Sequence, residues 1–233
     1  MPDFFLDIYQ LRIIFALLML SIGSTLDLWK RTVHDSLWIA FGVIAIVLVF
    51  LEPSFSDAIV EFGISLIIVP IALITWRMGV FGGADAFCLI VLSALASHVT
   101  FSDSFVTPIT TLTNAALLSI VTIFVNLTRN GIAILNHKNI FEGFTETKLR
   151  KTCAMFLGYR SNKPKFSFSI ERIEGSNKKL DFSIHHAEHD EFCKTPNTWV
   201  SPGIPFLVYI AGGFILQLLF GDIILNSLTS LYV

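Results

Sequence analysis

Apolar runs long enough to cross a lipid bilayer recur along this chain, and they limit the folds that it can adopt. A helix needs about 20 mostly apolar residues to span the hydrocarbon region. Hydrophobic residues make up 54% of the chain and charged residues only 15%, whereas soluble domains carry about 25% charged residues. We therefore predict a membrane all-α fold with six transmembrane helices. The runs comprise residues 9–26, 37–51, 58–76, 86–101, 109–127 (or on to 135) and 204–220 (or on to 228).

One long segment, residues 136–199, is polar and charged. Within it, "KFSFSIERIE" (165–174) and "KLDFSIHH" (179–186) alternate apolar and polar residues, a pattern that is typical of β-strands. Upstream, "TETKLRKTCAMFLGY" has the spacing of an amphipathic helix. Its apolar face carries Leu149, Cys153 and Phe156. We expect a small α+β domain outside the bilayer, inserted before the last helix.

The short connections between the apolar runs differ in charge, and this difference predicts their side of the membrane. Connections after the first, third and fifth runs contain Lys or Arg, and those after the second and fourth contain neither. Because cytoplasmic loops carry an excess of Lys and Arg, we expect both termini outside and the polar segment in the cytoplasm. The basic residues are Lys30, Arg31, Arg77, Arg129 and Lys138. The predicted domains are 1–135 (spans one to five), 136–199 (cytoplasmic α+β domain) and 200–233 (sixth span).

Two aspartates lie at the predicted inner ends of membrane spans. Asp27 ends the first run, which goes inward, and Asp85 precedes the fourth run, which goes outward, so both are expected at the same depth. Taken alone, Asp27 can be a solvated helix end, and Asp85 can be a helix N-cap, the role that we also expect for Asp35. Taken together, Asp27 and Asp85 offer an aspartic dyad, in which one carboxylate activates water and the other polarises a carbonyl.

Glycines gather just before Asp85, at Gly79, Gly82 and Gly83. Glycine adopts a positive φ without strain and lets another backbone approach closely. Irregular backbone at membrane depth is tolerated only where it is buried in protein or lines a cavity. We expect this loop either to adopt φ > 0 or to approach a substrate strand.

A second polar cluster, "HHAEH" with Cys193, allows two interpretations. Its histidines are His185, His186 and His189. Histidine and cysteine are common zinc ligands. The simpler interpretation, a polar surface loop without metal, is the one that we favour.

Three motifs of the chain are similar to those of one protease family. "FGGADA" (81–86) looks like a G-x-G-D motif, "LDLWKRTVHDSLW" (26–38) resembles a first-aspartate segment, and "WVSPGIPFL" (199–207) resembles the approach to a last span. These are motifs of the type IV prepilin peptidase-like family of intramembrane-type aspartic proteases, and the last is similar to archaeal preflagellin (archaellin) peptidases. The six-span layout with a cytoplasmic insert is also similar to that group.

The resemblance implies roles for five residues. Asp27 and Asp85 would be the catalytic aspartates, and Gly82, Gly83 and Ala84 would form the substrate-binding or loop part of the motif. Ala84 replaces the usual second glycine, and archaeal members are known to accept a small apolar residue there. The four-cysteine cluster of bacterial prepilin peptidases is absent from a chain with three cysteines, so coupled N-methylation is not expected.

The function that the resemblance implies is a membrane aspartic endopeptidase. It would clip short basic leader peptides from archaellin or type IV pilin-like precursors at the cytoplasmic face of the membrane, without a metal or organic cofactor. The expected partners are those precursors and the lipid bilayer, and the net charge of -2 gives no indication of a nucleic-acid partner. Two alternatives stay open: a proton- or cation-coupled transporter that uses Asp27 and Asp85, and a membrane scaffold whose cytoplasmic domain binds a partner.

Overall fold

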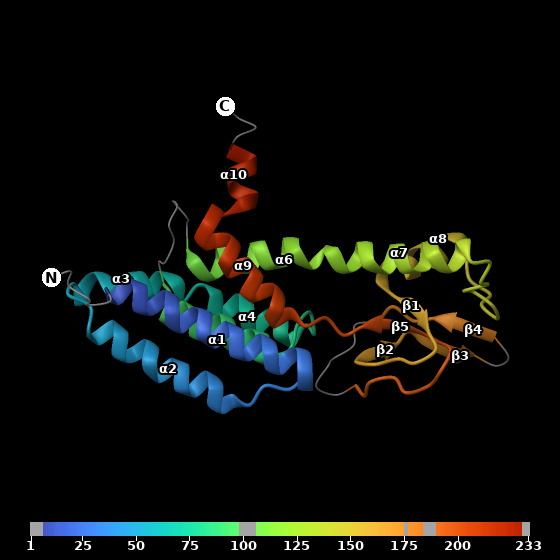
Figure 1. Cartoon of the computed structure of the whole chain (residues 1–233), viewed down its shortest axis with the longest axis horizontal. Coiled ribbons are helices and arrows are strands. Elements are labelled where there is room, and N and C mark those ends of the chain that lie inside the picture. Colours follow the sequence, from blue (N-terminus) through green and yellow to red (C-terminus); the bar gives the residue numbers. More distant parts are fainter. Residues whose placement is uncertain (1–6, 98–105, 175–176, 184–189, 230–233) are drawn as a thin grey trace. The chain divides into compact units, whose positions relative to one another are not determined.

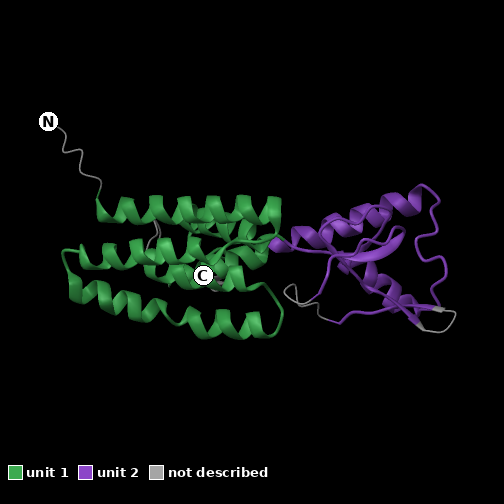
Figure 2. Cartoon of the chain, turned by 90° about the horizontal axis from the view of Figure 1, so that it is seen from below, with its two compact units in different colours: residues 1–118, 205–233 green, residues 119–204 purple. Residues whose placement is uncertain are grey.

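The structure, a computed structural model of the chain, describes residues 7–97, 106–174, 177–183 and 190–229. Packing contacts divide the chain into two compact units (Figure 2). The helical unit comprises residues 1–118 and 205–233, and the mixed unit comprises residues 119–204. The predicted domain boundaries refer to the membrane surface and not to packing, and they stay a prediction.

Helix α5 forms the centre of the helical unit, because it contacts α1, α2, α3, α4 and α9. The side chains of Leu89, Leu92 and Leu95 on α5 are fully buried. A helix that is surrounded in this way can be apolar on all sides. The helices of this unit are α1 (Ile8–Lys30), α2 (Asp35–Phe50), α3 (Phe55–Ser65), α4 (Ile68–Arg77), α5 (Gly83–Leu95), α6 (Thr107–Ser119), α9 (Phe206–Phe220) and α10 (Ile223–Thr229) (Figure 1).

Among the described residues, three helical stretches are long and apolar enough to cross a membrane. They are Ile8–Lys30, Phe55–Arg77 and Thr107–Leu135. The apolar helices α2, α5 and α9 are shorter, in the range of 10–17 residues. The prediction of a mostly helical membrane protein with a small strand-containing region is confirmed. Membrane crossing by the three shorter helices, and with it the count of six spans, stays a prediction.

The predicted third span folds as two helices with a turn between them. Helix α3 ends at Ser65, and α4 begins at Ile68. Pro70 explains the break, because proline has no N–H to donate and its ring clashes with the carbonyl four residues earlier, that of Leu66. The run is therefore interrupted at residues 66–67, and the second helix begins two residues before its proline.

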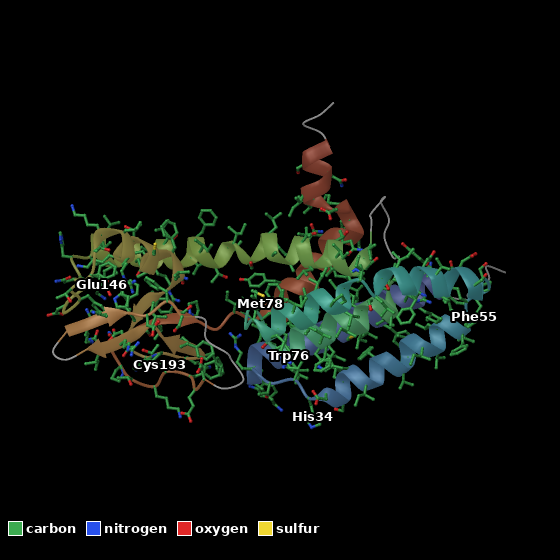
Figure 3. All side chains as sticks on the ribbon, turned by 180° about the vertical axis from the view of Figure 1, so that it is seen from behind. His34, Phe55, Trp76, Met78, Glu146 and Cys193 are labelled. Carbon is green, nitrogen blue, oxygen red and sulfur yellow. The ribbon has the colours of Figure 1, made fainter. Side chains whose placement is uncertain are left out.

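The start of α2 differs from the prediction. We expected Asp35 as its N-cap, but the N-cap is His34, which is labelled in Figure 3. The Nδ1 of His34 accepts a hydrogen bond from the backbone N–H of Ser36 at 3.4 Å. Asp35 is the first residue of the helix, where its negative charge suits the positive end of the helix dipole. A ring nitrogen of histidine can accept a backbone N–H as a carboxylate would, so His34 fills the cap and Asp35 lies inside the helix.

The mixed unit combines two helices with two small antiparallel sheets. One sheet has the order β1-β5-β2, and the other is the hairpin β3-β4. In the hairpin, Glu171 pairs with Leu180 and Glu174 with Asn177. The elements are α7 (Val121–Leu135), α8 (Lys148–Leu157), β1 (Tyr159–Ser161), β2 (Ser167–Ser169), β3 (Glu171–Glu174), β4 (Asn177–Leu180) and β5 (Thr198–Pro202).

The strands only partly follow the sequence pattern. The alternating stretch 165–174 is divided between β2 and β3, which belong to different sheets, with Ile170 between them. The second predicted strand begins as β4 but is not a strand at residues 181–183, and its remainder lies outside the described residues. Strands β1 and β5 were not predicted. Strand β1 has only three residues, and β5 overlaps the motif 199–207, which we interpreted only as the approach to the last span.

Helix α8 is confirmed, but its apolar face is not the buried one. Leu149 is 74% exposed and Phe156 is 39% exposed, whereas Ala154 is fully buried. The C-terminal end of α8 is attached to α7 by two buried asparagines, Asn126 and Asn130, which donate hydrogen bonds to its last carbonyls. These polar contacts, and not apolar spacing, decide which way α8 turns.

Candidate active site

Asp85 lies in the first turn of α5, at its third residue. The N-cap of this helix is Gly82, so the alternative role for Asp85, that of the N-cap itself, is wrong. Its carboxylate instead reaches back, and its Oδ2 accepts the backbone N–H of Gly82 at 2.9 Å. The Asp85 side chain is buried, with 8% of the residue exposed. The hydrogen bond therefore holds a carboxylate inside the protein with one oxygen tied to the backbone.

Asp27 lies in the last turn of α1 and is half-buried. The helix ends at Lys30, and its C-cap residue, Arg31, adopts the left-handed conformation with φ 58°. The backbone N–H of Arg31 donates to the carbonyl oxygen of Asp27 at 3.1 Å. The chain therefore turns back immediately after the aspartate, which brings the guanidinium of Arg31 close enough to interact with the carboxylate of Asp27.

The helical unit brings the two aspartates together. Helix α1 contacts α5, and the carboxylates of Asp27 and Asp85 lie close enough for their charges to interact. Arg31 interacts electrostatically with both carboxylates. Two acids that are far apart in sequence thus form one cluster, and Arg31 is a cation that neighbours both. Such a pair can hold a proton on one member and accept a proton on the other.

Helix α9 completes the cluster, and the sequence reasoning did not single out its part. The backbone N–H of Leu207, in the first turn of α9, interacts with the carboxylate of Asp27. The hydroxyl of Ser24 donates to the carbonyl oxygen of the same Leu207 at 3.0 Å. The rings of Phe81 and Phe206, just before α5 and at the start of α9, stack with centroids 5.6 Å apart. The motifs "FGGADA" and "WVSPGIPFL" contain Phe81, Phe206 and Leu207, but nothing local in the sequence marked Ser24.

The loop glycines meet different requirements. Gly79 has φ +73°, the left-handed conformation that favours glycine. Gly82 has an extended backbone with φ -79° and ψ 165°, so the expectation of φ > 0 does not apply to it. Gly83 is buried in the first turn of α5, and Ala84 packs half-buried against the apolar core. A Cβ atom added at Gly82 would lie 3.5 Å from Oδ2 of Asp85, so a larger side chain there would crowd the carboxylate.

Among the residues that the structure describes, no three His, Cys, Asp or Glu side chains lie close enough together to hold a metal ion. The histidines of the second polar cluster, His185, His186 and His189, lie outside the described residues. Cys193 is half-buried in the mixed unit. The chemistry that the described site offers is therefore that of two carboxylates and one guanidinium.

Comparison with known proteins shows that the chain is similar to archaeal peptidases. The family described as "Archaeal Peptidase A24 C-terminus Type II" matches residues 126–223. A "Preflagellin peptidase" of Methanococcus maripaludis is 26% identical over 238 aligned residues, covering 94% of this chain and 99% of that protein. The chain is similar to preflagellin peptidases over most of its length. The resemblance that the motifs indicated is confirmed.

Two other preflagellin peptidases align with this chain over a similar share of its length. The "Preflagellin peptidase" of Methanocaldococcus jannaschii is 26% identical over 231 residues, covering 91% of this chain and 95% of that protein. The "Preflagellin peptidase" of Methanococcus voltae is 26% identical with the same coverage of this chain and of that protein. An alignment that covers 91% of this chain must include most of both compact units. The similarity to preflagellin peptidases therefore extends over the helical unit and the mixed unit.

Proposed function

We propose that this protein is a membrane aspartic endopeptidase that removes short basic leader peptides from archaellin or type IV pilin-like precursors. The observation that carries the proposal is the cluster that Asp27 and Asp85 form at the ends of α1 and α5. The substrate class is supported by the curated relatives, which bear the name preflagellin peptidase. Those comparisons do not favour the alternative of a coupled transporter.

The proposed reaction is hydrolysis of one peptide bond by a pair of carboxyl groups that shares one proton. The ionised member takes a proton from a water molecule as its oxygen attacks the scissile carbonyl carbon. The protonated member donates a hydrogen bond to the carbonyl oxygen, where negative charge develops. The tetrahedral intermediate then collapses, and the departing amine receives a proton from the pair. The pair is left with one proton, as at the start.

The starts of two helices keep the pair in place. The backbone N–H of Gly82 holds one oxygen of Asp85 at the N-terminal end of α5. The backbone N–H of Leu207 holds Asp27 at the N-terminal end of α9. Each carboxyl group is thus anchored through part of its hydrogen-bonding capacity, and the rest is available to water and substrate. Fixed donors of this kind cost no reorganisation during the reaction.

The proposed place of cleavage is the cytoplasmic surface of the membrane. On the predicted topology, Asp27 ends an inward span and Asp85 begins an outward one, so both lie at the inner surface. A precursor with an apolar membrane helix and a charged leader presents the bond between these parts at that surface. The depth of the pair and the depth of the scissile bond then agree.

The deciding experiment is cleavage of a purified precursor by single variants. Asp27→Asn and Asp85→Asn should each lower the cleavage rate by at least about 10²-fold, because a general acid–base group contributes roughly 10²–10⁴. The amide oxygen of Asn can still accept the N–H of Gly82 or of Leu207, so these changes remove the proton chemistry and keep the fold. Sequencing the new N-terminus of the product identifies the bond that is cut.

Two further variants serve as controls for this experiment. The double change at Asp27 and Asp85 should be no worse than either single change, since the two residues act as one unit. Asp35→Asn should retain cleavage, because Asp35 is exposed and the cap of α2 is provided by His34. Undiminished cleavage by either single Asn variant would remove that aspartate from the catalytic pair.

A further inference from the structure

A serine one helical turn before Asp27 makes a contact that the proposed chemistry does not use. Ser24 is half-buried on α1, and its hydroxyl donates to the backbone carbonyl of Leu207 on α9 at 3.0 Å. The two residues are separated by 183 positions in the sequence. Hydroxyl groups inside a helix usually bond to the carbonyl of their own preceding turn. Ser24 instead ties its helix to the first turn of another one.

The residue that Ser24 holds is the residue that faces Asp27. Ser24 and Asp27 are three positions apart on α1, so they lie on the same side of the helix. Leu207 presents its carbonyl to Ser24 and its N–H to the carboxylate of Asp27. Leu207 is thus in contact with α1 through both its carbonyl and its N–H, close to the start of α9.

Packing around this contact leaves little room for movement. The side chain of Leu207 is only 1% exposed, and a Cβ atom added at Gly23 would lie 3.7 Å from one of its methyl groups and 3.4 Å from the ring of Trp38. On the other side, Phe206 stacks on Phe81 with an angle of 6° between the rings. Helices α1 and α9 pack against each other, and the Ser24 hydroxyl adds a hydrogen bond between them.

We propose that Ser24 is a positioning residue for the first aspartate, because it holds Leu207 so that the N–H of that residue is directed at Asp27. The proposal rests on the proposed function, in which Asp27 reacts with water and substrate. Ser24 itself touches neither of them. Loss of the Ser24 hydroxyl leaves the Asp27 carboxylate in the site but lets the direction of that carboxylate vary. Misdirection of a reacting group lowers the rate of the chemical step more than it weakens substrate binding.

The test is steady-state cleavage of a leader peptide precursor by purified full-length variants. Ser24→Ala should lower kcat roughly three- to tenfold, the effect expected from one lost hydrogen bond, with KM within about twofold of wild type. Ser24→Thr keeps a hydroxyl at the same place and should restore most of kcat. The matched control is Thr25→Val, since the Thr25 hydroxyl is exposed and bonds only to Ser21 of its own helix, at 2.7 Å.

A second measurement reports on the contact between Ser24 and Leu207 without relying on cleavage. Hydrogen–deuterium exchange of the peptide that contains Leu207 should be faster in Ser24→Ala than in wild type and in Thr25→Val. Unchanged exchange and unchanged kcat in Ser24→Ala would overturn the positioning role while Asp27→Asn remains inactive. Full activity of Asp27→Asn in the same assay would instead overturn the proposed function. A rise in KM without a fall in kcat would assign Ser24 to substrate binding and contradict the proposal.

Discussion

At the scale of single residues, the hydrogen bond between Gly82 and Asp85 combines a structural and a proposed catalytic role. The N–H of Gly82 would have no partner in α5, because the first N–H groups of a helix have no carbonyl before them. Asp85 satisfies it at 2.9 Å, and the same contact holds the carboxylate inside the protein. The backbone of Gly82 does not need a glycine for a positive φ, and the nearby carboxylate of Asp85 limits how large a side chain can be at this position.

This interpretation predicts a graded response at Gly82. Gly82→Ala should keep most of the cleavage activity, because its Cβ would be at 3.5 Å from Oδ2 of Asp85, an ordinary contact distance. Gly82→Val should reduce kcat at least about tenfold, since its additional methyl groups crowd the carboxylate and misdirection by about 1 Å can cost roughly 10²-fold. Ala84→Gly is the control and should be tolerated. Equal activity of the alanine and valine variants would show that space at Gly82 is not needed.

At the scale of secondary-structure elements, buried polar contacts determine how the mixed unit is assembled. Asn130 is buried on α7, and its amide group donates to the carbonyls of Met155 at 3.0 Å and Gly158 at 2.8 Å. Asn126 donates to the carbonyl of Phe156 at 3.1 Å. The last carbonyls of a helix have no partner within it, so these asparagines complete the end of α8.

Loss of the hydrogen bonds that Asn130 donates should destabilise the mixed unit. Asn130→Ala leaves two carbonyls without their donor, and we expect the free energy of unfolding to fall by about 1–3 kcal/mol. Urea unfolding followed by pulse proteolysis of the purified protein measures the change. The control is Asn136→Ala, at an exposed asparagine just after α7, which should alter stability by less than about 0.5 kcal/mol. Equal stability of the two variants would contradict the role of Asn130.

At the scale of the whole molecule, charge is distributed unequally between the two units. Twelve of the 16 Lys and Arg residues lie in residues 119–204. Short loops, and not long domains, carry the orientation signal, so the basic mixed unit is weaker support than the basic connections at Lys30, Arg31 and Arg77. Both features place the mixed unit in the cytoplasm in our prediction. The native cysteines allow this orientation to be tested.

Cysteine labelling should report the side on which each unit lies. Cys153 is exposed on α8, so a membrane-impermeant maleimide should label it in inside-out vesicles and not in intact cells. Cys88 is buried in α5 and should react in neither. In a Cys153→Ser, Cys193→Ser background, Ser54→Cys should be labelled in intact cells, because its loop is predicted outside. Labelling of Cys153 in intact cells would reverse the predicted orientation and separate the aspartates from a cytoplasmic leader.

The sequence by itself was sufficient for features that depend on local pattern. Each apolar run contains a helix, and the helix α8 lies where its spacing placed it, because helix formation follows a periodicity that a short window of residues carries. Asp27 and Asp85 could be chosen as candidates because acids next to apolar runs are costly and therefore conspicuous. The division of residues 165–174 between two sheets could not be foreseen, since strands of three or four residues are too short to show a period.

Only the tertiary structure decided how the candidate site is built. The hydroxyl of Ser24 and the carbonyl of Leu207 meet across 183 positions, and no property of either residue's neighbours specifies that contact. The stacking of Phe81 on Phe206 and the choice of His34 over Asp35 as a cap likewise depend on where side chains lie in space. Sequence pattern indicates where a helix forms, whereas the face that it buries and the partners that it meets are set by the packing of all elements together.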